Sequence, residues 1–194
     1  MKIGKEVLII LVFIITSFSL ALSLWANSSK DNVEKPVFLL NGGIGFSEIK
    51  DHMGFSFGGF IAFLKKNNIY SLRYIRNDRI HYTLPVNPSQ SENREYIDEL
   101  GLLYGKIWNL YEDILMMNIS IGISRVNGQK LGRLLDNFEY EKIKIETFGI
   151  PFSFQLFNRF NGPLAICINF FGNYNNESSF YGILLGLQFT KYKK

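Results

Sequence analysis

Cysteine, histidine and proline are scarce in this chain, and its charge content is low. The 194 residues include one cysteine, two histidines and five prolines, and charged residues make up 20%. The single Cys167 excludes an intramolecular disulfide bond and any metal site built from several cysteines. The 21 basic residues outnumber the 17 acidic residues by four, but they are scattered, so nucleic acid is not expected as a partner.

Apolar and aromatic residues are abundant instead. Apolar residues make up 47% of the chain, and 18 Phe and 10 Tyr dominate the aromatic set. This composition excludes a disordered or collagen-like chain. It requires either a large core or a membrane to take up the apolar surface.

The N-terminal segment has the order of a secretory signal. Two lysines precede an apolar run over residues 7–24, and the chain then turns polar. This order predicts a signal peptide over 1–26, a short periplasmic lead over 27–36 and a folded unit over 37–194. The run is close to the ~20 residues that span a bilayer as a helix, so an uncleaved anchor is the alternative. No cysteine directly follows the run, so a lipid anchor is not expected.

Alternation of apolar and small polar residues with a period of two recurs from residue 37 onward and predicts β-strands. In one segment Ile119, Ile121 and Ile123 share a face opposite Ser120 and Ser124. The alternation is clean in four segments: 54–63, 115–124, 147–156 and 181–190. It is less clean in four more: 37–46, 69–77, 99–108 and 163–173. The sequence therefore predicts eight strands.

The connections between these segments alternate in length. Long connections are expected at 47–52, 78–98, 126–141 and 173–179, and short ones at 64–68, 109–113 and 157–162. Alternating long and short connections are typical of an up-and-down antiparallel barrel, with the long ones at one end.

The two faces of the strands differ in a way that predicts which face contacts lipid and which face lines the lumen. One face carries Phe, Ile and Leu without charge in its middle positions, and the other carries Gly, Ser, Asn, Thr and Gln. A charge at the midplane of a membrane barrel costs about 2–4 kcal/mol, and small polar side chains suit a narrow lumen. The predicted fold class is therefore all-β, an eight-stranded antiparallel up-and-down transmembrane β-barrel after an N-terminal signal peptide. A soluble β-sandwich is the alternative, but it would need a more charged outer face.

With this pattern the chain resembles a known family. The signal, the eight strands and the final strand over 181–189 are similar to small outer-membrane β-barrel proteins of Gram-negative bacteria, the OmpA-barrel, OmpX-like and PorT-like group. The resemblance covers residues 37–192 and carries no signature motif. It implies a place in the cell outer membrane, insertion by the barrel assembly machinery, and contact with lipid bilayer and lipopolysaccharide. Lys193 and Lys194 after Tyr192 depart from the usual aromatic end of the last strand.

No motif predicts a catalytic residue, a bound cofactor or a metal site. The glycine-rich segment 41–45 lacks the following helix and the third glycine of a dinucleotide-binding motif, and glycines relieve crowding at barrel bends. His52 and His81 fall on the side of the long connections and are expected to be solvated. Arg73 and Glu99 are predicted to point inward, where they either pair in the lumen or lie at its rim.

The predicted role is structural or interactive, and no enzyme activity is expected. Side chains fill the lumen of an eight-stranded barrel, so no open pore is expected. The connections 78–98 and 126–141 are the candidate surfaces for a partner, because binding residues concentrate on loops held by a rigid scaffold. Two alternatives are a lipid-modifying barrel enzyme, with His52 and Ser56 as the nearest approach to a catalytic pair, and a soluble lipocalin-like periplasmic carrier.

Overall fold

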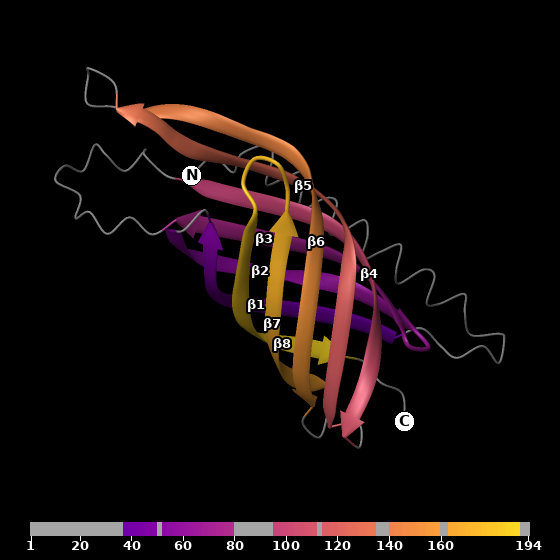
Figure 1. The fold of residues 1–194 in the computed structure, drawn as a ribbon. Coiled ribbons are helices and arrows are strands. Elements are labelled where there is room, and N and C mark those ends of the chain that lie inside the picture. The colour runs from indigo at the N-terminus through magenta and orange to yellow at the C-terminus, as the bar shows by residue number, and fades with distance from the viewer. Residues whose placement is uncertain are drawn as a thin grey trace, which may run out of the picture. The chain divides into compact units, whose positions relative to one another are not determined.

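The described part of the chain is a closed β-barrel. The computed structural model describes residues 37–49, 52–79, 95–111, 114–134, 140–159 and 163–190. Eight antiparallel strands follow one another in chain order, and β1 closes the ring on β8 (Figure 1). The strands are β1 (Val37–Ile49), β2 (His52–Lys65), β3 (Asn68–Arg79), β4 (Tyr96–Tyr111), β5 (Leu115–Leu134), β6 (Tyr140–Arg159), β7 (Leu164–Tyr174) and β8 (Phe180–Thr190). The predicted eight-stranded up-and-down barrel is confirmed.

The N-terminal expectations lie outside the described residues. The signal peptide over 1–26, its alternative as an uncleaved anchor, and the lead over 27–36 all fall there and stay predictions. In the part of the chain that the structure describes, no helix is long and apolar enough to cross a membrane.

The predicted faces of the strands are also confirmed. On β5, Ile121 and Ile123 are exposed, whereas Ser120 and Ser124 are buried in the lumen. The same alternation places the apolar residues of the other strands outside the ring, where they face lipid. The alternatives that put the apolar face inside, a soluble sandwich or a lipocalin-like carrier, are therefore wrong.

A row of aromatic rings marks the border of the apolar band at the end of the barrel that carries the short turns. Phe38, Phe63, Tyr70 and Tyr104 are successive cross-strand partners on β1 to β4. Their ring centroids are 5.6, 6.4 and 5.2 Å apart in that order. Aromatic girdles at this position meet the lipid headgroups in membrane barrels.

Several long connections are shorter than predicted because the strands run further. Residues 126–134 belong to β5, and β6 already begins at Tyr140, so the predicted 126–141 loop is mostly a β-hairpin. The 78–98 loop is also too long, since β3 ends at Arg79 and β4 begins at Tyr96. Beyond the lipid both faces of a strand are wet, so the alternation that reveals a strand in the sequence fades while the backbone pairing continues.

Similar corrections apply to two other predicted loops. In place of the 47–52 loop, β1 continues to Ile49, and this residue pairs with His52, the first residue of β2. In place of the 173–179 loop, β7 continues to Tyr174. Asn173 therefore belongs to a strand and points into the lumen, where it is fully buried.

The glycine-rich segment 41–45 is part of a wall bend and not of a ligand-binding loop. Gly43 pairs with Gly58 on β2 and with Gly186 on β8, so three glycines lie side by side. A Cβ atom at Gly58 or Gly186 would lie 2.4 Å from a carbonyl oxygen of the adjacent strand. Only glycine permits this close approach, which lets three neighbouring strands coil tightly.

The lipid-facing assignment predicts the effect of a charge in the band. Ile121→Lys should lower the free energy of unfolding by about 2–4 kcal/mol, because the ammonium group would lie in hydrocarbon. Asn127→Lys on the same strand, beyond the band, is the matched control and should change it by less than about 0.5 kcal/mol. Urea unfolding in phospholipid vesicles, followed by tryptophan fluorescence, measures both values. Equal effects of the two substitutions would contradict the assignment.

Candidate functional site

The lumen is filled in three layers, of which the outer two are apolar. The cluster toward the short turns includes Leu39, Phe60, Leu64, Ile69, Ile107, Met116, Phe157 and Cys167. The cluster toward the long connections consists of Ile75, Ile97, Val126, Ile145, Phe171, Phe180 and Leu184. The sequence predicted a filled lumen, but with small polar side chains as the filling. The large apolar residues close both ends of the lumen to water.

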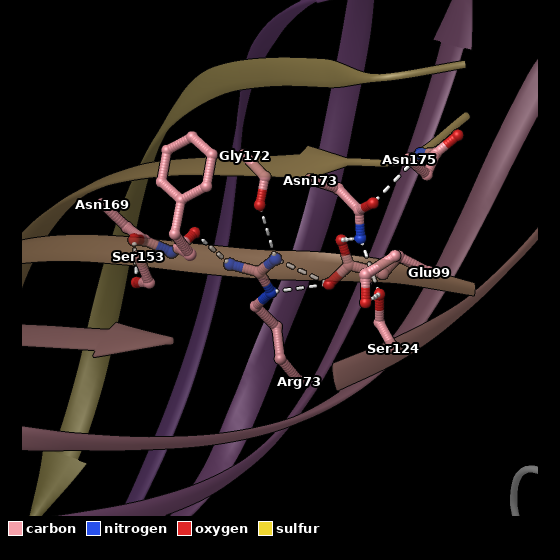
Figure 2. Close-up of polar contacts among 10 residues, drawn as sticks. Arg73, Glu99, Ser124, Ser153, Asn169, Gly172, Asn173 and Asn175 are labelled. Atoms are coloured by element: carbon pink, nitrogen blue, oxygen red, sulfur yellow. Dashed lines mark hydrogen bonds and ion pairs between the residues drawn. The ribbon is translucent and has the colours of Figure 1, made fainter. Parts of the chain in front are cut away.

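A buried ion pair lies in the middle layer. The Arg73 guanidinium contacts Oε1 of Glu99 through Nη2 at 2.6 Å and donates through Nε at 2.8 Å (Figure 2). The remaining donors of Arg73 reach the backbone carbonyls of Phe152 at 2.8 Å and Gly172 at 3.2 Å. Among the described residues, these two are the buried charged side chains. The predicted pairing inside the lumen is confirmed, and the alternative position at the rim is wrong.

The ion pair continues into a chain of side-chain hydrogen bonds. Asn173 donates through Nδ2 to Oε2 of Glu99 at 2.7 Å and to Oγ of Ser124 at 2.6 Å. Asn175 in the β7–β8 turn donates to Oδ1 of Asn173 at 3.0 Å, as Figure 2 shows. At Gly149 a Cβ atom would lie 2.0 Å from that same Oδ1 atom, so only glycine leaves room for the amide. The network thus links the centre of the lumen to a turn at its rim.

This network lies beside a gap in the barrel wall. The pairing of β5 with β6 omits residues 122–123 opposite 150–151, although the register is the same on both sides. Pro151 has no N–H group and cannot donate to the ladder. On either side of the gap, the carbonyl of Phe152 accepts from Arg73, and that of Gly149 accepts from Ser124 at 3.4 Å. The side chains of the lumen therefore donate to the backbone carbonyls that flank the gap.

The histidines do not form a catalytic pair. His52 is exposed at the rim, whereas Ser56 is fully buried and donates its hydroxyl to Asn77 at 2.7 Å. Four residues along one strand separate the two by about 13 Å. His81 lies outside the described residues. Within the described ranges, no three His, Cys, Asp or Glu side chains gather in a group that would hold a metal ion.

At the end of the long connections, β5 and β6 continue past the ring. The β6–β7 pairs begin only at Ile150 with Tyr174, so residues 140–149 pair with β5 alone among the described strands. Figure 1 shows this hairpin, in orange, extending beyond its neighbours. Near the tip of the hairpin, Glu95 accepts from the backbone N–H of Leu131 at 2.7 Å and pairs with Arg79. No pattern in the sequence predicts this edge, because an edge is created by the point at which the neighbouring strand ends.

Charged side chains cover the outer face of the hairpin. Glu146 forms ion pairs with Arg125 across the strand and with Lys144 on its own strand at 2.9 Å. Hydrogen bonds from Lys144 and Arg125 lower the pKa of the Glu146 carboxyl below its usual value. The carboxylate is therefore ionised at neutral pH and forms ion pairs with both Arg125 and Lys144.

The chain has the fold of the small eight-stranded outer-membrane β-barrels. The solved structures most like it include Neisserial surface protein A, with a TM-score of 0.59 and 8% sequence identity over 82% of this chain and 99% of that one. The N-terminal β-barrel domain of Pseudomonas aeruginosa OprF has a TM-score of 0.53 and 15% sequence identity over 80% of this chain and 97% of that one.

A third similar structure carries a ligand. Ail, the attachment invasion locus protein of Yersinia pestis, in complex with the heparin analogue sucrose octasulfate, has a TM-score of 0.53 and 8% identity over 80% of this chain and 99% of that one. No protein-family model and no curated protein matches the sequence. The likeness therefore concerns the fold, which is the OmpA/OmpX-like eight-stranded barrel.

The ion pair predicts that removing one of its two charges destabilises the barrel more than removing both. Arg73→Met should destabilise the barrel by about 3–5 kcal/mol, because Glu99 keeps a buried charge without its partner. Arg73→Met combined with Glu99→Gln should recover part of this loss, since no uncompensated charge is then left. Urea unfolding of the variants in the same lipid measures the difference. Additive losses in the double variant would show that the two charges do not depend on each other.

The layered lumen predicts a closed barrel. In planar lipid bilayers, the refolded protein should give no steady ion conductance, because apolar clusters lie on both sides of the polar layer. Phe171→Ser with Phe180→Ser removes the two largest rings from one cluster and should raise the frequency of brief current steps. Steady conductance by the unchanged protein would contradict the closed lumen.

Proposed function

We propose that this chain is an exported outer-membrane protein that acts by binding a partner through its protruding β5–β6 hairpin, as neither a pore nor an enzyme. In outer-membrane barrels the short turns face the periplasm and the long connections face the exterior. The hairpin extends from the end of the long connections, so it reaches outside the cell.

The free edge of β6 is the observation that carries this proposal. Residues 140–149 form ten consecutive positions whose N–H and C=O groups on the β7 side have no strand partner among the described residues. At about 3.3 Å per residue, this edge is about 33 Å long. Such an edge is a template for an extended segment of another chain, which would add as a further strand.

The side chains along this edge favour a specific partner over uncontrolled aggregation. Lys142 and Lys144 alternate with Ile143 and Ile145. Charged residues, lysine above all, keep an edge from pairing with any exposed strand. A partner segment that carries acidic residues opposite the lysines satisfies both the backbone and the charges.

A binding role also agrees with the rest of the barrel. The lumen is filled by side chains, and the buried polar network holds the wall together, which leaves the exterior as the surface available to a partner. Among similar barrels, Ail is known in complex with a heparin analogue, which supports ligand binding by a barrel of this size. The lipid-modifying alternative has no comparable support, because His52 and Ser56 lie apart.

A shortened hairpin tests the proposal. Gln129 and Lys144 are cross-strand partners, so residues 130–143 can be replaced by an Asn-Gly turn that closes the hairpin at that pair. Peptides selected by phage display against the full barrel in nanodiscs should bind the shortened barrel at least tenfold more weakly, because four of the ten edge positions, 140–143, are gone. A proline at the centre of a selected peptide should abolish its binding.

Two controls keep the result interpretable. The shortened barrel should keep its heat-modifiable migration in gels, since the lumen network and the ring are unchanged. A barrel with Ala at Glu177, in the exposed β7–β8 turn, should bind the selected peptides as the full barrel does. Equal binding to the full and shortened barrels would overturn the proposal.

A further inference from the structure

A groove of about 540 Å³ crosses the lipid-facing side of β2 to β5. One wall is a row of aliphatic cross-strand partners, Ile61, Leu72, Leu102 and Ile123. The other wall is the next outward row toward the short turns, Phe63, Tyr70, Tyr104 and Ile121. Ala62 and Leu103 lie between the two walls with their side chains buried in the lumen, so their backbone forms the floor.

The dimensions of the groove suit one extended hydrocarbon chain. The walls are two residues apart along each strand, which separates their backbones by about 7 Å. Four strands spaced by about 4.8 Å give the groove a length of about 14 Å. An α-helix with its side chains is about 10–12 Å wide, so a helix of another protein does not fit between the walls. Apart from the hydroxyls of Tyr70 and Tyr104, the walls offer no polar side-chain atom.

A third row on the same face carries positive charge. Two residues further toward the short turns, Lys65, Asn68 and Lys106 are cross-strand partners. Both lysines are exposed, and Oδ1 of Asn68 accepts from the Tyr104 hydroxyl at 2.8 Å. About 10 Å separates the backbones of the two lysines, because one strand lies between them. Both ammonium groups can therefore reach a single anion held over Asn68.

Groove and lysines lie together on one side of the barrel. Lys66 in the β2–β3 turn adds a third cation next to Lys65, whereas β1, β7 and β8 contain no lysine. Every carboxylate among the described residues lies in the lumen or toward the long connections. Bulk bilayer surrounds the whole ring, but an anionic lipid is attracted to this side in particular.

We propose that this side of β2 to β5 is a selective site for one anionic glycerophospholipid in the leaflet next to the short turns. The rows follow the order aliphatic, aromatic and cationic, which matches the acyl chain, ester groups and phosphate of such a lipid. Lys65 and Lys106 donate charge-assisted hydrogen bonds to the phosphate, and one acyl chain lies in the groove. The site lies at the opposite end of the barrel from the free edge of β6, so it does not depend on the proposed function.

Phosphatidylglycerol and phosphatidylcholine with identical acyl chains provide the test. The refolded full chain in neutral detergent is titrated with each lipid, and native mass spectrometry gives the bound fraction. One phosphatidylglycerol should be retained per barrel, and phosphatidylcholine should bind more weakly. K65Q with K106Q should weaken phosphatidylglycerol binding about 25-fold, since each lysine near an anionic lipid contributes about a factor of five. K144Q, at the other end of the barrel, is the matched control and should leave binding unchanged.

A second pair of variants tests the groove separately from the charge. L102W places a large ring in the groove and should weaken the binding of both lipids, because the acyl chain loses its space. L100W adds the same ring on the same strand, outside the groove, and should leave binding unchanged. Heat-modifiable migration in gels confirms that each variant is folded.

Three outcomes would overturn the proposal. The first is equal retention of the two lipids. The second is binding that either K65Q with K106Q or L102W leaves unchanged. The third is full displacement of phosphatidylglycerol by millimolar glycerol phosphate, which would show that the lysines take the free anion and not the lipid.

Discussion

The structure depends on one constraint, that every backbone N–H and C=O group inside hydrocarbon must have a hydrogen-bond partner. Closing β8 on β1 satisfies it around the ring. Pro151 breaks it locally, because residues 122–123 form no ladder pairs with residues 150–151. Arg73 and Ser124 donate to carbonyls beside that gap, so the buried ion pair stabilises the barrel wall at this position. Glu99 and Asn173 then hold Arg73 and Ser124 in the positions from which they donate.

The narrow ring also determines what the lumen can do. The lumen of eight strands is narrow enough for side chains to fill, and this chain fills both ends with apolar clusters and the middle with a polar network. A charged pair in such a place has no water to contact and no room for a substrate. Among the described residues, the outer surface and the rim are thus the parts of the barrel that a partner can reach.

The sequence predicted the fold well where the two faces of a strand meet different surroundings. Ile121 faces lipid and Ser120 faces the lumen, so the alternation between them is strong. Residues 129–133 are half-buried or exposed on both faces, and their pairing leaves no alternation that can be detected in the sequence. Arg73 and Glu99 were predictable because each is a charge in an inward row. Their partner Asn173 was not, because 74 residues separate it from Glu99 and only the register of the closed ring brings them together.

The constraint that closes the ring also explains why the hairpin is open. An unpaired strand edge is excluded in hydrocarbon but tolerated in water, where solvent satisfies its polar groups. The ladder between β6 and β7 ends at Ile150, and from Gly149 to Tyr140 no described strand pairs with β6 on its β7 side. Phe148 and Arg125 face each other at this same level, so the apolar surface ends and the charged surface begins where the ring opens. Backbone pairing and side-chain chemistry therefore change together at one boundary, and the proposed binding edge of β6 lies on its outer side.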